Sequence, residues 1–424
     1  MKFIHTADWH LGNSMHDIDR IKEVRAFFDW LKEQINEQKA EALIVSGDIF
    51  DTINPPVAAR REYYRFLASL LDTGCCNVII VTGNHDSAPL IDAPKDLLEA
   101  LNIHVVGSIS DDVQIENCVF ELKDNAGNVC GICAAIPFVR EPDLRKFTYD
   151  GDENFADNSF KELYRRAYEA ADSLRAGRNI PIIATGHLYA ANLEGRLSEI
   201  DCSTKTDDGT KRIDLVGNLG AINVSAFPPE FDYVALGHIH YPTRVAKNDR
   251  IRYSGSPFLL GFDEVNIPRK ILLVETECGS VPQVTPLEVP TFFDFIRIEG
   301  TVEEIKTAMA GLCLKNFERE TYIEIAYEVE IGKNIHDALS EFSINPPLHI
   351  VSWKPRFRGG RHYDSTLESF GVSDVNELSE EEVFKELIRS NLRKIGLDPE
   401  SEEAKQCIDE YLPLFIEIAN EVEK

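Results

Sequence analysis

Short apolar runs separated by polar turns fill the first 280 residues of the chain. Five runs are rich in β-branched residues and apolar throughout, which is typical of buried strands: they are Phe3–Thr6, Ala42–Ser46, Val78–Thr82, Ile182–Thr185 and Tyr233–Leu236. Segments with apolar residues at helical spacing predict helices at Asp19–Lys39 and Val57–Leu71. We therefore expect an α/β domain over residues 1–280, closing with the run Lys270–Glu277.

A smaller unit follows a stretch punctuated by proline, Val281–Pro290, which is typical of a linker. A helical pattern at Val302–Leu314 lies among three strand-like runs, Phe293–Ile298, Thr321–Val329 and His349–Trp353. This order predicts an α+β domain over residues 290–361. Its basic end, Lys354–Arg361, either touches phosphate or is a solvated linker.

Two further segments leave their roles open. The tail, residues 366–424, carries two amphipathic helical patterns, of which the first begins with a capping box of Ser379 and Glu382. These helices either dock on their own small core or bind a partner. The long segment Asn192–Pro229 is expected to be a surface excursion, near DNA or simply a loop.

Polar residues with metal-binding side chains follow each of the five predicted strands. Ligands of an open α/β sheet bind outside the carboxyl ends of its strands, so distant residues can converge there. The candidates are Asp8, His10, Asp48, Asp51, Asn84, His85, His187, His238 and His240. Each fragment alone is usually a plain turn, but five in order, each behind a strand, favour one shared site.

The ligand types indicate a pair of divalent metals. Mixed Asp, Asn and His ligands suit manganese, iron or zinc, whereas thiolates would have indicated structural zinc. Seven ligands are too many for one tetrahedral ion: Asp8, His10, Asp48, Asn84, His187, His238 and His240. Two metals held roughly 3.5 to 4 Å apart activate a water and bind both oxygens of an in-line displacement at phosphorus. Because the two ions outweigh the two carboxylates, the site would attract an anion.

His85 is set apart from the ligands because its neighbour Asn84 is already counted among them. We assign His85 to the substrate side, where an imidazole can protonate a leaving oxygen or stabilise charge on the phosphoryl group. Asp51, three residues beyond Asp48, is the best candidate to orient that ring, although it could simply cap the following segment.

The motifs Asp-x-His, Gly-Asp-x-x-Asp, Gly-Asn-His-Asp, Gly-His and Gly-His-x-His together resemble the signature of the calcineurin-like metallophosphoesterase superfamily. The stretches Lys2–Gly12, Gly47–Thr52 and Gly83–Ser87 more narrowly resemble the SbcD family of bacterial exonuclease subunits. The fold implied is an α/β metallophosphoesterase β-sandwich flanked by helices, with a smaller α+β capping domain and a C-terminal helical tail.

The resemblance also implies roles for the site residues. One metal ion would be held by Asp8, His10, Asp48 and His240. A second would be held by Asp48, Asn84, His187 and His238, so that Asp48 bridges both. Mn²⁺ is the metal implied. His85 would be the catalytic histidine, positioned by Asp51.

Partners are implied by the resemblance alone. The family works with SbcC, an SMC-like ATPase, and acts on DNA as a homodimer within a heterotetramer. The capping domain helps to shape the DNA path. The tail helices, residues 366–424, would clasp the base of the SbcC coiled coil, which we favour over docking on their own core.

The formal net charge of −28 complicates the expected DNA substrate. Binding to a phosphate backbone is driven by Lys and Arg displacing counterions. We therefore expect weak intrinsic DNA affinity, with a partner supplying much of the binding.

Nine cysteines without an export signal argue against structural disulfides. Cys130 and Cys133 have redox or zinc spacing, but they lie in an apolar run and are expected in a buried strand. No segment is apolar enough to span a bilayer, so a cytoplasmic protein without membrane contact is expected.

We therefore expect a two-metal phosphodiesterase acting on DNA ends and hairpins, as a 3′ to 5′ double-strand exonuclease and single-strand endonuclease. A general phosphatase or cyclic-nucleotide phosphodiesterase remains an alternative, because the metal motifs alone do not distinguish esters. A metal-bound scaffold that tethers SbcC to DNA without cutting is a second alternative.

Overall fold

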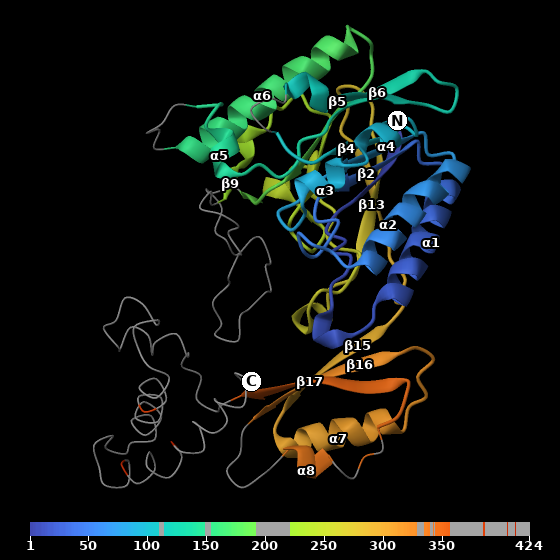
Figure 1. Ribbon diagram of the computed structural model, residues 1–424, viewed down its shortest axis with the longest axis vertical. Coiled ribbons are helices and arrows are strands. Elements are labelled where there is room, and N and C mark those ends of the chain that lie inside the picture. Colours follow the sequence, from blue (N-terminus) through green and yellow to red (C-terminus); the bar gives the residue numbers. More distant parts are fainter. Residues whose placement is uncertain are drawn as a thin grey trace. The chain divides into compact units, whose positions relative to one another are not determined.

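A computed structural model of the protein (Figure 1) describes residues 1–109, 114–148, 154–191, 221–328, 335–339 and 344–356, with residues 342, 385, 405 and 412. Met1–Arg356 form one compact unit and Phe357–Lys424 a second. The predicted tail helices, most of the segment Asn192–Pro229 and the basic cluster beyond residue 356 lie outside the described residues. Among the described helices, none is long and apolar enough to cross a membrane.

The first of two six-stranded sheets has the order β14-β13-β1-β2-β3-β4. Its central strands β1 to β4 run parallel, and β13 and β14 are antiparallel additions. The bounds are β1 Lys2–Thr6, β2 Ala42–Ser46, β3 Asn77–Val81, β4 Ile103–Val106, β13 Lys270–Glu275 and β14 Gln283–Glu288.

The second sheet has the order β11-β12-β10-β7-β6-β5. Its bounds are β5 Val119–Lys123, β6 Val129–Ala134, β7 Ile182–His187, β10 Tyr233–Gly237, β11 Thr243–Arg244 and β12 Ile251–Tyr253. A short pair, β8 Ala190–Ala191 and β9 Ile222–Asn223, lies outside it. The helices of this part are α1 Ile21–Gln38, α2 Val57–Ser69, α3 Ala88–Asp92, α4 Lys95–Glu99, α5 Glu141–Leu144 and α6 Phe155–Arg175.

Alternate residues of the first sheet belong to two different cores, because successive side chains of a strand point to opposite faces. Phe3, Ile44 and Ile79 pack with residues of the second sheet, so the two sheets form a sandwich. Ile4 and Leu43 pack instead with the buried faces of α1 and α2. Figure 1 shows α1 and α2 side by side on one flank and α6 across the other.

A third sheet of parallel strands has a separate core. It consists of β15 Asp294–Gly300, β16 Thr321–Glu328 and β17 Leu348–Arg356, with helices α7 Val302–Cys313 and α8 Ile335–Leu339. Thr301 and Glu304 form a reciprocal capping box at the start of α7, which satisfies free backbone N–H groups there. Short 3-10 turns include η1 Met15–Asp17, η2 Leu70–Asp72, η3 Ile115–Cys118, η5 Val224–Ala226, η6 Val245–Lys247 and η7 Phe262–Glu264.

The five strands predicted to precede the candidate ligands and the two helices predicted in residues 1–280 are confirmed, with ends shifted by one or two residues. The linker prediction is wrong, because Gln283–Glu288 is the edge strand β14, paired with β13. Pro286 is compatible with this position, since an edge strand tolerates a missing N–H group. Cys130 and Cys133 lie in β6 as expected, and the cysteines of the described part are all free. The division into three domains stays a prediction.

Candidate metal centre

The candidate ligands lie at the carboxyl ends of five strands, three in the first sheet and two in the second. Asp8 and His10 follow β1, Asp48 follows β2, and Asn84 follows β3 in the first sheet. His187 ends β7 and His238 and His240 follow β10, in the second sheet. From the sequence, we expected these ligands to converge at the edge of one open sheet. The strands that carry them belong instead to two different sheets. The sandwich brings two sheet edges to one place.

Four candidates adopt a left-handed backbone conformation that residues other than glycine rarely take: Asp8, His10, Asp48 and His238, with φ of 54°, 44°, 50° and 100°. The loops after β1 and β2 hold each other in this conformation. The N–H group of Asp8 donates to the Gly47 carbonyl at 3.0 Å, and that of His10 donates to the Asp48 carbonyl at 3.0 Å. Such strain persists only where the surroundings fix it, and it concentrates at functional sites.

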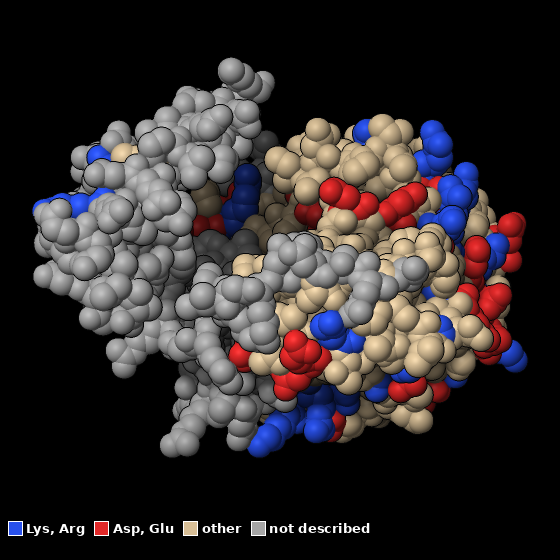
Figure 2. Space-filling model, turned by 90° about the horizontal axis from the view of Figure 1, so that it is seen from below, with Lys and Arg blue, Asp and Glu red and all other residues tan. Residues whose placement is uncertain are grey.

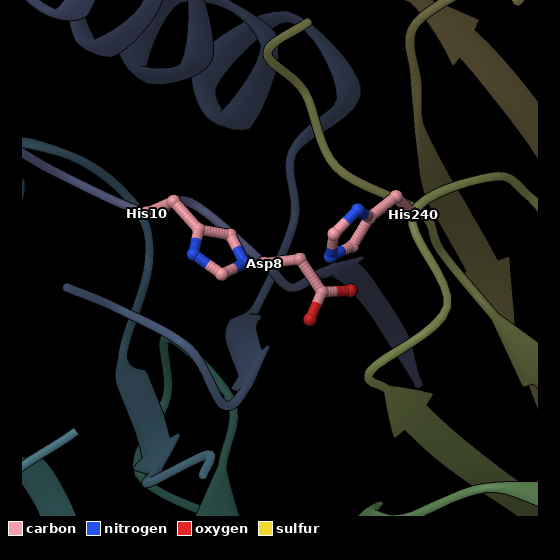
Figure 3. Close-up of side chains that lie close together, drawn as sticks. All are labelled: Asp8, His10 and His240. Carbon is pink, nitrogen blue, oxygen red and sulfur yellow. The ribbon is translucent and has the colours of Figure 1, made fainter. Parts of the chain in front are cut away.

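Asp8, His10 and His240 form a first group, whose potential ligand atoms lie within 4.8 Å of one another. Both imidazoles turn a nitrogen toward the Asp8 carboxylate (Figure 3). Nδ1 of His10 lies 3.1 Å from the Asp51 carboxylate, and Nδ1 of His240 lies 3.3 Å from the Glu264 carboxylate. Carboxylates behind histidines in this way orient the ring and leave Nε2 for a metal.

Asp48, His187 and His238 form a second group of the same kind. His187 Nδ1 donates to the Ser46 carbonyl at 2.9 Å, and Nε2 faces Asp48 Oδ2 at 3.2 Å. The Asn84 side-chain oxygen lies 3.0 Å from His187 Nε2 and 3.2 Å from His238 Nδ1. All seven predicted ligands are thus brought together, in two adjacent groups.

The donor set fits divalent cations. Among the described residues, Asp8 Oδ2 and His10 Nε2 are buried without a hydrogen-bond partner, although both groups are chemically able to bind a cation. Asp48 Oδ2 lies 3.5 Å from His10 Nε2 and 3.2 Å from His187 Nε2, so one oxygen faces a histidine of each group. Buried polar atoms are normally paired, and a bound cation would account for these exceptions.

The protonation of the second group is consistent with this donor set. Burial lowers the pKa of His187, but the nearby Asp48 carboxylate outweighs it and raises that pKa to about 9. Burial raises the pKa of Asp48, yet His187 and His10 together hold it well below its usual range. Since His187 Nδ1 donates to Ser46, the additional proton lies on Nε2, between Asp48 and Asn84. A cation bound there would replace this proton.

His85 lies beside the first group and is exposed. Its ring centroid lies 4.9 Å from that of His10, and its Nδ1 donates to the backbone carbonyl of Asp51 at 2.8 Å. The carboxylate of Asp51 contacts His10 instead. The expectation that Asp51 orients His85 therefore needs a correction, because its main chain rather than its side chain makes the contact. Potential ligand atoms of His10, Asp51 and His85 also lie close enough together to bind an ion. The hydrogen bonds from the two imidazoles to Asp51 already explain this short spacing.

Sequence reasoning missed two supporting carboxylates. Asp86 is buried and accepts hydrogen bonds from the N–H groups of Gly83, Ile49 and Phe50, which ties the loop after β3 to the loop after β2. Burial, and then Asp48, raise the pKa of Asp86 to about 7. Its place beside His85 in the Gly-Asn-His-Asp motif was a usable signal. Glu264 follows no strand, so the sequence contained no comparable signal for it.

Comparison with known proteins places the chain in a family. Residues 1–242 match the family model of calcineurin-like phosphoesterases. The chain is 30% identical to the SbcD subunit of the nuclease SbcCD of Escherichia coli K12, over 96% of this chain and 95% of that protein. The chain belongs to the SbcD family of calcineurin-like phosphoesterases. It is therefore a metal-dependent phosphodiesterase, and the predictions of family, fold class and enzyme class are confirmed.

Two further relatives of this phosphoesterase are SbcD subunits as well. The SbcD subunit of Rhodobacter capsulatus is 32% identical over 75% of this chain and 78% of its own length. The corresponding protein of Bacillus subtilis is 29% identical over 66% and 67%. Among solved structures, GAP50 of Plasmodium matches 69% of the chain at a TM-score of 0.31, which adds nothing to this assignment.

Proposed function

We propose that this phosphoesterase is a Mn²⁺-dependent nuclease that works with an SbcC ATPase on DNA ends and hairpins, in DNA recombination and repair. The observation that carries the proposal is the pair of adjacent ligand groups, Asp8–His10–His240 and Asp48–His187–His238. The relatives, which are SbcD subunits of the nuclease SbcCD, support DNA as the substrate and SbcC as the partner.

In this proposal, Asp8, His10, Asp48 and His240 hold one cation. Asp48, Asn84, His187 and His238 hold the other. The position of Asp48 Oδ2 between His10 and His187 supports its role as the bridge. When bound, two divalent cations supply Lewis-acid stabilisation to an in-line displacement at phosphorus and lower the pKa of water.

His85 is the residue that would donate a proton to the leaving oxygen. Because its Nδ1 donates to the Asp51 carbonyl, Nε2 is the nitrogen left to exchange a proton with substrate. Its exposure leaves that nitrogen accessible. His85→Gln should therefore abolish cleavage and leave Mn²⁺ binding nearly unchanged, as measured by nuclease assay and calorimetry. Loss of both ions in this variant would instead indicate that His85 is a metal ligand.

The surface charge supports a partner-dependent mode of DNA binding. On the face drawn in Figure 2, Lys and Arg residues form separate groups with Asp and Glu residues between them. With a net charge of −28, the isolated chain should bind duplex DNA weakly, and addition of SbcC should increase the affinity and the salt dependence. Tight binding by the isolated chain in a salt titration would refute this.

Partner binding is proposed to use residues 366–424 on the SbcC coiled coil, within a cytoplasmic heterotetramer that contains a homodimer of this chain. A chain ending at residue 365 should then lose SbcC association in a pull-down experiment. Association that survives the deletion would contradict this part of the proposal.

The decisive experiment compares substrates. Labelled duplex and hairpin DNA are incubated with Mn²⁺, with and without SbcC, beside a small phosphomonoester and a cyclic nucleotide. We expect DNA cleavage that Asp48→Asn abolishes and that His104→Gln, a histidine outside the site, leaves intact. Hydrolysis of the small esters without DNA cleavage would favour the general phosphatase alternative.

A further inference from the structure

The two ligand groups differ in what holds their histidines. In the second group, His187 is fixed by the Ser46 carbonyl at the end of β2, inside the sandwich. In the first group, His10 and His240 are each fixed by a carboxylate, Asp51 or Glu264. Each of these carboxylates is held in turn by further side chains, and these contacts connect it to the third sheet.

The contacts behind His10 lead to Arg20. Asn13 donates to the Asp51 carboxylate at 3.1 Å, and Arg20 Nη1 donates to the Asn13 side-chain oxygen at 3.2 Å. Arg20 is buried and is held by Glu23 at 2.7 Å and by the Leu259 carbonyl at 2.7 Å. Its guanidinium lies 5.7 Å from the ring centroid of Phe295, a residue of β15 in the third sheet. Cation and ring at this distance attract each other.

The contacts behind His240 also lead to Phe295. Glu264 ends the turn η7 and is held there by Arg269, at 3.1 Å, and by the Leu260 N–H group, at 3.2 Å. Phe262 begins this turn, and its ring centroid lies 5.8 Å from that of Phe295, edge to face. Both sets of contacts therefore connect β15 with a carboxylate that orients a histidine of the first group.

We propose that Arg20 and Glu264 are positioning residues through which the third sheet sets the geometry of the Asp8–His10–His240 cation position. In the Asp48–His187–His238 position, His187 is instead fixed by a backbone carbonyl of the sandwich. This inference rests on the proposed pair of cations. Carboxylates behind metal-binding histidines change affinity by about 10- to 100-fold, so a shift of β15 changes one position and leaves the other. Because such coupling is reciprocal, cation binding at the first position also stabilises the packing of β15.

Mn²⁺ titrations of the full chain test the inference, by calorimetry and by electron paramagnetic resonance of the coupled ion pair. Arg20→Met and Phe295→Leu should weaken one of the two binding events roughly tenfold and leave the other. Arg25→Met is the matched control: Arg25 lies in the first turns of α1, close in sequence to Arg20, but it pairs with Glu62, which keeps Arg65 as a partner in this variant. Should Arg20→Met fail to fold, Phe295→Leu and the double variant Arg20→Met/Glu23→Gln, which leaves no unpaired buried charge, replace it.

Hydrogen exchange gives a readout that does not depend on activity. In the wild type, Mn²⁺ should slow exchange of β15 amides, and Arg20→Met should reduce this protection while Arg25→Met keeps it. Equal weakening of both binding events, or no change in either, overturns the inference while leaving the proposed function intact. A wild-type chain that binds fewer than two Mn²⁺ ions overturns the proposed function, and the inference with it.

Discussion

Individual residues of the centre are held in conformations that they would not adopt alone. Asp8, His10, Asp48 and His238 all have positive φ, which costs of order 1 kcal/mol each. The loops carrying Asp8 and His10 bond to the loop carrying Asp48, and Asp86 ties the latter to the loop after β3. The centre thus depends on close contact between loops, which residues outside the predicted ligand set help to maintain.

Gly83 is one such residue. A Cβ atom at this position would overlap the side chain and backbone nitrogen of Asp48, which cannot move without breaking the contacts of its loop. Gly83→Ala should lower the free energy of unfolding by about 1–3 kcal/mol and weaken Mn²⁺ binding, as measured by urea unfolding and calorimetry. Gly74→Ala is the control, since its nearest atom would lie at 3.7 Å. Equal effects of both substitutions would contradict this prediction.

His5 is a buried histidine outside the centre. The Tyr233 hydroxyl donates to its Nδ1 at 3.0 Å, and its Nε2 donates to the Leu236 carbonyl at 3.2 Å, so the neutral ring is fully satisfied. Burial is the main reason that the pKa of His5 falls from 6.5 to about 3. Between these two values the unfolded chain binds one proton more than the folded chain, so stability is lost as pH falls below 6.5.

We therefore expect His5 to cost the folded protein about 2 kcal/mol at about pH 5, relative to neutral pH. His5→Gln, which cannot titrate, should unfold with a shallower dependence on pH. Urea unfolding of the two proteins across this range measures the difference. Parallel pH profiles would contradict the assignment.

The elements that position the centre were largely predictable from the sequence, because their strands are buried on both faces and read as continuous apolar runs. β14 was not, since its residues are mostly exposed and include Pro286, which together resemble a linker. The roles of Glu264 and Arg20 were not predictable either, because only the tertiary fold brings turn η7 and the start of α1 close to the histidines. The division of the strands between two sheets also left no local trace in the sequence.

Helices α1 and α2 pack against the loop that carries Asp8 and His10. Trp9, which separates these ligands, contacts Phe28 of α1 and Phe66 of α2, with ring centroids 5.2 and 5.8 Å apart. Phe66 also stacks on Phe28 at 4.3 Å.

Phe66→Ala should therefore destabilise the protein by about 3–5 kcal/mol and also weaken Mn²⁺ binding, because Trp9 loses a neighbour. Leu71→Ala, at an exposed position, should change stability by less than about 0.5 kcal/mol. Thermal unfolding and calorimetry measure both effects. If Phe66→Ala changed stability but left Mn²⁺ affinity untouched, the helices would not support the loop in this way.

At the scale of the whole molecule, the two sheets of the sandwich meet at a cluster of buried ionisable side chains. Buried carboxylates from the first sheet face histidines of the second, and the raised pKa of His187, due largely to Asp48, keeps a balancing positive charge on that ring. Cations that bind only the folded chain stabilise it, by about 2.7 kcal/mol at a concentration of 100 times Kd. Chelation should therefore lower the melting temperature.

Binding should also release protons, and this tests the charge balance directly. With a pKa of about 9, His187 is protonated near neutral pH in the chain without cations, and it must become neutral to bind a metal through Nε2. About one proton should therefore leave per chain from this residue at about pH 7.5, and markedly less at about pH 9.5, where His187 is already mostly neutral. Mn²⁺ affinity should rise with pH across the same interval. Calorimetry in buffers of different ionisation enthalpy measures the released protons, and equal release at both pH values would exclude His187 as their source.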